Sequence, residues 1–235
     1  MISRCLVCLV GTSQAENLGA VARLLDNFAV PSLTLVASRV AAGDVRAQVV
    51  ARAARERLAA ARRTDELADA VADCAYVVGF SARRGADRPL VGLRQLPALL
   101  AERAPSGRIA LVFGPEDSGL AKAHIDRCDA VAVIDTPGPL PSLNLAQAVA
   151  VALWELGRAG EEAAPARGGA THAELDALVD HATAALDRFG HFRSDEERAR
   201  GRVHWRRALA DAALRSDDIR ALHRLCDSIT RPARE

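Results

Sequence analysis

The chain has 235 residues, half of them apolar, which is enough for one complete α/β domain with an appendage, or for two small domains. Its 31 basic and 30 acidic residues nearly cancel, which argues against a protein that binds polyanions over its whole surface and still allows a local basic patch. The five cysteines are an odd number and no signal peptide opens the sequence, so we expect reduced thiols and a cytoplasmic protein. No apolar run reaches membrane-spanning length.

Short apolar runs alternate with segments of helical character in the first two thirds of the chain. Each run is continuous and aliphatic or β-branched, which is typical of strands that are covered on both faces. The predicted strands are 5–10, 33–37, 75–80, 109–113 and 130–134, and the predicted helices are 18–28, 46–61, 64–73, 97–104, 119–127 and 142–156. This alternation predicts an α/β domain with a parallel sheet wrapped by helices.

A stretch rich in glycine, alanine, proline and glutamate, "GRAGEEAAPARGGA", follows at 157–170 and shows no periodicity. Beyond it, amphipathic patterns predict helices at 171–189, 203–215 and 217–230, the first two joined by the charged connection "HFRSDEERARGR". We therefore expect a domain over 1–158, a linker over 159–170 and an all-helical extension over 171–235.

Cys5 and Cys8 form a C-x-x-C pair inside the first apolar run. A structural zinc site needs a second pair of ligands, and the sequence offers none at suitable spacing. We interpret the pair as part of a buried strand and expect no metal site.

Four segments that leave the carboxyl ends of predicted strands are rich in Gly, Ser, Pro or Asn. Ligands of parallel sheets bind beyond these ends, so the segments are candidate ligand loops. They are "GTSQAENLGAVAR", "GFSARRG", "FGPEDSGL" and "DTPGPLPSLN". None carries a Gly-rich dinucleotide or P-loop pattern, which disfavours those two ligand classes.

Polar residues in these loops allow a structural and a functional interpretation. Asn17 is expected to cap its helix. Arg23 lies opposite the apolar stripe of that helix, as either a solvated side chain or a guanidinium that grips phosphate. Glu116 is either part of a turn, with Asp117 or Ser118 as helix cap, or a carboxylate that binds hydroxyl or amino groups.

The helix that starts near Ser142 is apolar on most of its faces. Such a helix is either enclosed by its own domain or packed against another subunit, and we expect a homodimer built around residues 143–156. Its first turn carries Ser142 and Asn144. One cap residue would satisfy the helix, so the presence of two favours a binding site.

Residues 38–63 form the strongest basic patch, with seven arginines against two acidic residues. The patch is either a solvated Ala/Arg helix face or a track for an RNA backbone. The arginines are Arg39, Arg46, Arg52, Arg55, Arg57, Arg62 and Arg63. A second cluster in the tail comprises Arg198, Arg200, Arg202, Arg206 and Arg207.

Three motifs occur in order: "ENLGAVARLLDNF", "LVFGPEDSGL" and "PSLNLAQAVAVALWEL". Together they resemble the SPOUT RNA methyltransferases, in particular the TrmH-like 2′-O-ribose methyltransferases, over residues 1–158. The tail, which ends in "LRSDDIRALHRLCDSI", is similar to the extension of the TrmJ-like branch, which modifies the tRNA anticodon loop.

The resemblance implies a C-terminal trefoil knot, a homodimer and S-adenosylmethionine as cofactor. It implies 2′-O-ribose methylation of RNA, with a tRNA anticodon loop favoured over the alternatives, ribosomal RNA or a catalytically silent RNA-binding dimer. The implied catalytic residues are Asn17, Arg23, Glu116, Ser142 and Asn144. The implied cofactor residues are Phe80, Ser81, Ala82, Gly114, Glu116, Gly119, Ile134, Ser142, Leu143 and Asn144. The RNA-binding candidates are Arg23, Arg39, Arg46, Arg52, Arg55, Arg83 and Arg84.

Three departures from the family pattern stand out. Ala15 and Glu16 replace a frequent Pro-Gly, Ala29 replaces the usual glycine after Phe28, and Pro115 stands where the branch often has Arg or Asn. None of them removes a core motif residue.

Overall fold

The computed structural model describes residues 1–82, 89–140, 142–159, 169–212 and 214–230. The chain forms two compact units, Met1–Ala166 and Arg167–Glu235, and each is described by itself.

The first unit is built on a parallel sheet, as predicted. In the described residues seven strands pair in the order β3-β2-β1-β6-β4-β7-β5. The strands are β1 (Cys5–Val10), β2 (Ser32–Val36), β3 (Arg62–Thr64), β4 (Cys74–Phe80), β5 (Leu90–Gly92), β6 (Arg108–Phe113) and β7 (Ala130–Val133). The five predicted strands are confirmed, whereas β3 and β5, at the two edges of the sheet, were missed. The trefoil knot stays a prediction.

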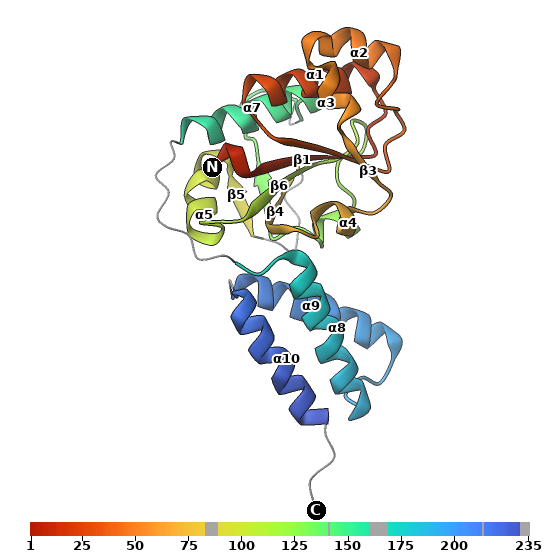
Figure 1. Ribbon diagram of the computed structural model, residues 1–235, viewed down its shortest axis with the longest axis vertical. Coiled ribbons are helices and arrows are strands. Elements are labelled where there is room, and N and C mark those ends of the chain that lie inside the picture. The colour runs from red at the N-terminus through yellow and green to blue at the C-terminus, as the bar shows by residue number, and fades with distance from the viewer. Residues whose placement is uncertain (83–88, 141, 160–168, 213, 231–235) are drawn as a thin grey trace, which may run out of the picture. The chain divides into compact units, whose positions relative to one another are not determined.

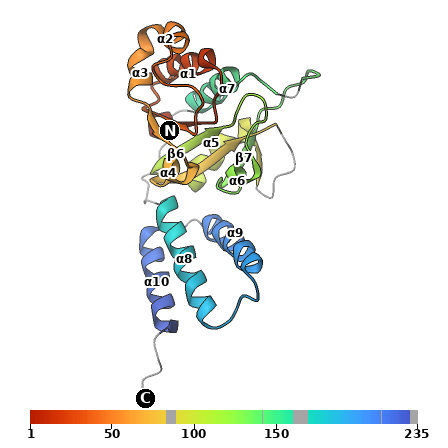
Figure 2. The same cartoon turned by 90° about the vertical axis from the view of Figure 1, so that its right-hand side faces the viewer.

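Helices cover both faces of this sheet. The side chains of α1 (Ala15–Asn27), α2 (Val45–Ala51), α3 (Arg55–Ala59), α5 (Leu96–Arg103) and α7 (Leu145–Arg158) share one core cluster. Those of α4 (Leu67–Val71) and α6 (Lys122–Ile125) share the other. Figures 1 and 2 show α1, α2, α3 and α7 on the side of the sheet opposite α4. The described part of the unit also holds the 3₁₀ turns η1 (Ile2–Arg4), η2 (Arg52–Ala54) and η3 (Leu93–Gln95).

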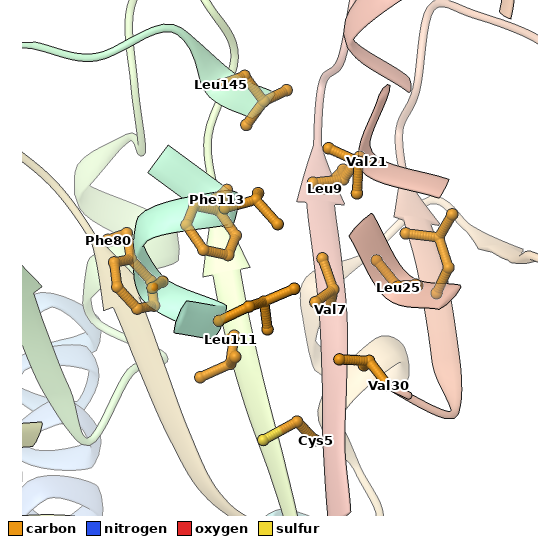
Figure 3. Packing of buried hydrophobic residues seen from close by; sticks show 14 of the residues in the cluster. Cys5, Val7, Leu9, Val21, Leu25, Val30, Phe80, Leu111, Phe113 and Leu145 are labelled. Atoms are coloured by element: carbon orange, nitrogen blue, oxygen red, sulfur yellow. The ribbon is translucent and has the colours of Figure 1, made fainter. Parts of the chain in front are cut away.

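Strand β1 explains why the first apolar run is continuous. Its alternate residues Cys5, Val7 and Leu9 enter the first cluster, and the residues between them enter the second. Figure 3 shows Cys5, Val7 and Leu9 along β1, facing the side chains of α1 and of the neighbouring strand. Cys5 and Cys8 are fully buried, and burial raises the pKa of the Cys5 thiol to about 11. The interpretation of the C-x-x-C pair as buried strand is confirmed.

The prediction of one continuous helix over 46–61 is wrong. The structure has three shorter elements there, α2, η2 and α3. The break lies at Arg52, whose φ of 52° is left-handed and ends α2. Ala29, just after α1, has the same left-handed φ of 52°. The helix predicted over 64–73 begins only at Leu67, because residues before it belong to β3.

In its described part, the second unit holds α8 (His172–Arg188), α9 (Asp195–Asp211) and α10 (Ser216–Thr230). A small apolar cluster of Ala170, Leu175, Leu178 and Ile219 joins α8 to α10. The charged connection predicted after 189 is wrong in its length, because α9 already begins at Asp195, with Ser194 as its cap.

Helix α9 packs against α8 through a row of ion pairs. Arg198 contacts Asp187 at 2.9 Å, Arg202 contacts Asp180, and Arg206 contacts Asp176 at 2.8 Å. Arg206 is also the residue of α9 that is buried. Three arginines of the tail cluster are therefore paired with carboxylates within this helical unit.

The two tryptophans lie one in each unit, Trp154 on α7 and Trp205 on α9, and both side chains are exposed. None of the described helices combines the length and the apolar character needed to cross a membrane.

Candidate functional site

A cavity of about 280 Å³ opens at the carboxyl edge of the sheet. Its walls come from the ends of β4 and β7, the loop after β6 and the start of α7. The lining residues are Phe80, Ser81, Ala82, Phe113, Gly114, Pro115, Glu116, Asp117, Ser118, Gly119, Ala132, Ile134, Ser142, Leu143, Leu145 and Ala148. Nine of the ten residues assigned to a cofactor lie in this wall, and Asn144 directly follows its last loop.

The apolar wall contains a residue pair that the sequence did not single out. The rings of Phe80 and Phe113 stack with centroids 4.3 Å apart and 11° between planes (Figure 3). They meet because Phe80 pairs with Phe113 in the parallel register of β4 and β6. Phe113 closes an apolar strand in the sequence, so only this register could have identified it.

The loop after β6 folds back on itself at Gly114. A Cβ atom there would lie 2.3 Å from the backbone of Gly119 and Leu120, so only glycine permits this close approach. Gly119 itself has a φ of 66°, which also favours glycine. The two glycines of "FGPEDSGL" thus shape the pocket wall.

Glu116 is held by four hydrogen bonds from the start of α1. Its Oε2 accepts from the backbone N and the Oγ of Ser13, each at 3.1 Å. Its Oε1 accepts from Gln14 N at 3.3 Å and from Asn17 Nδ2 at 3.0 Å. Burial alone would raise the pKa of this carboxyl, but the hydrogen bonds from Asn17 and Ser13 outweigh it and lower the pKa. The group is therefore a fixed carboxylate at neutral pH.

Asn17 and Asn144 extend this network to α7. Asn144 Nδ2 donates to Asn17 Oδ1 at 2.9 Å, and Asn144 Oδ1 accepts from Ala146 N at 2.9 Å. Gln147 completes a capping box with Asn144. The loop after β6 and the starts of α1 and α7 thus form one polar network beside the pocket.

Several predicted caps are corrected by this geometry. Asn17 lies inside α1, which begins at Ala15, and its side chain bonds Glu116 instead of capping the helix. Asn144 is the N-cap of α7, so Ser142 lines the pocket without capping. Neither Asp117 nor Ser118 caps α6, because that helix begins at Lys122.

Arg23 does not lie in the pocket of its own chain. It is exposed, as expected for its position opposite the apolar stripe, and it follows Ala15 by eight residues, about 12 Å along the helix axis. Gly19, in the same motif, has a packing role: a Cβ there would lie 2.2 Å from the carbonyl oxygen of Ala47, so glycine lets α1 and α2 touch.

The arginines of 38–63 do not form a uniform track. Arg55 donates to the carbonyl of Gln48, and Arg57 bonds Asp26 and the carbonyl of Pro31. Arg46 lies beside Asp44 and Glu16. Arg63 donates to the carbonyls of Val40 and Ser38. With the described part of the chain, the side chains of Arg39, Arg52 and Arg62 make no hydrogen bond or ion pair. Arg83 and Arg84 lie outside the described residues.

Among the described residues, no three His, Cys, Asp or Glu side chains gather as metal ligands would.

Known proteins resemble this chain along most of its length. The tRNA (cytidine-2′-O-)-methyltransferase TrmJ of Methanocaldococcus jannaschii is 35% identical over 158 residues, covering 66% of this chain and 68% of that protein. Two further curated relatives are matched over 61% and 64% of their own length. The crystal structure of TrmJ from Z. mobilis ZM4 superposes with a TM-score of 0.83 at 30% identity, over 96% of this chain and 99% of that one.

A structure described as giving insights into the 2-OH methylation of C/U34 on tRNA has a TM-score of 0.52 at 27% identity, covering 66% of this chain and 95% of that one. The SpoU rRNA Methylase family matches residues 4–154, which span the sheet and the pocket. The chain therefore belongs to the SpoU rRNA methylase family.

Proposed function

We propose that the protein transfers the methyl group of S-adenosylmethionine to a ribose 2′-hydroxyl in the anticodon loop of tRNA. The observation that carries the proposal is the carboxylate of Glu116, fixed beside the pocket by Asn17 and Ser13, in a chain of this family. The names of the TrmJ relatives and the C/U34 title of the structural neighbour favour tRNA over other RNAs.

The pocket suits a molecule with an aromatic base, a sugar and a polar tail. Its volume of about 280 Å³ is near the lower end for small-molecule sites, roughly 300 Å³. Phe80, Phe113 and Ile134 offer an apolar slot for adenine, while Ser81, Ser142 and the backbone around Gly114 offer polar groups for the remainder. These residues would hold the cofactor, which supplies a methyl group already activated on a sulfonium.

The protein's own task is then to position the ribose and to favour loss of its hydroxyl proton. Glu116 is a poor proton acceptor, because four donors already hold its carboxylate and its pKa is lowered. An arginine is also a poor base, because its guanidinium stays protonated at neutral pH. We therefore assign Glu116, Asn17 and Asn144 to orientation, and Arg23 to gripping phosphate and stabilising the negative charge that develops on the ribose oxygen. The hydroxyl proton then passes to solvent water, and the demethylated cofactor is the leaving group.

We also propose a homodimer formed through α7. Leu145, Val149 and Leu153 of this helix are buried, yet Val151 and Trp154 are exposed, with 59% of Trp154 accessible. Because Arg23 does not line the pocket of its own chain, its proposed role requires that the RNA or a second copy bring the two together. Mixing Arg23→Ala chains with Gly114→Ala chains distinguishes the RNA from the second copy. Each mixed dimer would hold one intact Arg23 and one intact pocket on different chains, so recovered activity would place Arg23 beside the second copy's pocket.

The function is tested in two steps. Calorimetry measures binding of S-adenosylmethionine and its demethylated product to the purified chain, and we expect micromolar binding without added metal. Mass-spectrometric mapping of nucleosides then compares tRNA and ribosomal RNA from a deletion strain with the parent strain. Loss of one 2′-O-methyl mark from tRNA supports the proposal. Loss from ribosomal RNA would change the substrate, and absence of cofactor binding would leave only an RNA-binding role.

A further inference from the structure

We infer that Arg39 binds a backbone phosphate of the RNA at the mouth of the pocket, and that Arg63 positions it there. The inference rests on the proposed function, because it concerns the substrate of that same pocket. It singles out one arginine from a basic stretch whose members would otherwise be equivalent.

The loop that carries Arg39 is held by a neighbouring strand. Arg63, in β3, donates from Nη1 to the carbonyl of Val40 at 3.1 Å and from Nη2 to the carbonyl of Ser38 at 3.4 Å. Ser38 Oγ donates to the carbonyl of Val40 at 2.9 Å and accepts from Val40 N at 3.2 Å. The backbone on both sides of Arg39 is therefore fixed.

The same loop is bonded to the segment that holds Glu116. Arg39 N donates to the carbonyl of Thr12 at 2.9 Å, and Ser38 Oγ lies 3.4 Å from that oxygen. Ser13, the next residue, donates to Glu116 from both its backbone N and its Oγ. Arg63 is thus connected to Glu116 in the pocket wall by successive hydrogen bonds, through the loop at Arg39 and the segment at Thr12 and Ser13.

The backbone N of Arg39 is bonded to Thr12, and the positive charge of Arg39 acts on Asp117, a residue of the pocket wall. Asp117 lines the pocket, and its pKa is lowered by the hydrogen bond from Ser118 and by the positive charge of Arg39, among other contributions. The side chain of Arg39 is exposed and makes no hydrogen bond or ion pair within the described chain. Bidentate binding of a phosphate requires a fixed backbone and a guanidinium whose N–H donors are not already used by other acceptors.

Arg63 differs from Arg39 because carbonyl oxygens already occupy its guanidinium. It therefore acts through the loop and is a positioning residue. Arg4 offers a matched control, since it too donates to two carbonyls, those of Ala104 and Gly107, each at 3.0 Å. Arg4 precedes β1, at the amino edge of the sheet, away from the pocket.

The test measures binding of fluorescent tRNA by anisotropy at several salt concentrations, with the demethylated cofactor present. Arg39→Ala should weaken binding about tenfold and flatten the log–log salt slope by about one. The KM for tRNA should rise while kcat and cofactor affinity stay within twofold. Arg39→Lys should recover only part of the affinity, and Arg4→Ala should leave it within twofold.

A double-mutant cycle tests the positioning role. Arg63→Ala should weaken binding severalfold, and the Arg39→Ala/Arg63→Ala double variant should bind no more weakly than Arg39→Ala alone. Additive losses would overturn the role of Arg63, and wild-type affinity in Arg39→Ala would overturn that of Arg39. If the wild-type chain methylates tRNA in either case, the proposed function survives. A wild-type chain that binds cofactor but not tRNA would refute both.

Discussion

Replacing Glu116 by glutamine tests the polar network with almost no change in shape. The carboxylate accepts four hydrogen bonds, two on each oxygen. An amide keeps only one accepting oxygen, so two donors lose their acceptor and face an NH₂ group that also donates. We expect Glu116→Gln to destabilise the first unit and to loosen the junction of α1 with the loop after β6.

The magnitude follows from the number of lost bonds. A hydrogen bond to a charged group contributes roughly 1.5–3 kcal/mol, and two are lost. Glu116 is half-buried and Ser13 and Gln14 are exposed, so water replaces part of this loss. The expected decrease in the free energy of unfolding is about 2 kcal/mol at neutral pH. Glu102→Gln, on the exposed end of α5, should change it by less than about 0.5 kcal/mol.

The assay is urea unfolding of both variants and the wild type at several pH values. The folded-state pKa of Glu116 is lowered, so the carboxylate stabilises the fold above its ordinary pKa of 4.5, and this contribution is lost as pH falls through the lowered value. The difference in the free energy of unfolding between the wild type and Glu116→Gln should therefore have its full size at pH 7 and should decrease below about pH 4.5. A gap that is absent at pH 7, or that widens in acid, would refute the network as described.

Other substitutions test separate features. Ala29→Gly should raise the free energy of unfolding by about 0.5–1 kcal/mol, because Ala29 has a φ of 52°. The control Ala60→Gly, at a residue with φ −84°, should lower this free energy or leave it unchanged. Thermal unfolding of the two variants and the wild type measures both effects. Trp154→Glu should convert the proposed dimer to monomers in sedimentation, and a wild-type monomer at micromolar concentration would contradict the α7 interface. Arg23→Ala should reduce single-turnover methylation roughly 100-fold with cofactor affinity unchanged, and near-normal turnover would return Arg23 to a solvated role.

The sequence predicted the central strands because their side chains are buried on both faces. It missed β3 and β5 because each has three residues and lies at a sheet edge, where β3 shows two exposed arginines instead of an apolar run. Helix α9 was predicted to start too late because its first half contacts α8 through arginines, which produce no apolar periodicity.

The pocket residues could be found because they lie in motifs, but their partners could not. The rule that an Asn before an apolar stripe caps the helix failed at Asn17, because the acceptor for its side-chain NH₂ is Glu116, 99 residues away. The same limit applies to Arg39 and Arg63, because the sequence does not distinguish them from the other arginines of the stretch. The pairing of β3 with β2 is what brings Arg63 to the carbonyl oxygens of Val40 and Ser38.

The exposed tryptophans make the two units optically separable. Trp154 lies on the helix proposed for dimerisation and Trp205 lies on α9, which is joined to α8 by charge pairs. In the Trp205→Phe variant, a change of emission with protein concentration would report on α7 alone. In the Trp154→Phe variant, the fluorescence of Trp205 remains. An increase in its quenching by a neutral quencher at higher salt concentration would report that α9 separates from α8. Two single-tryptophan proteins would thus give each unit its own spectroscopic signal, without any attached label.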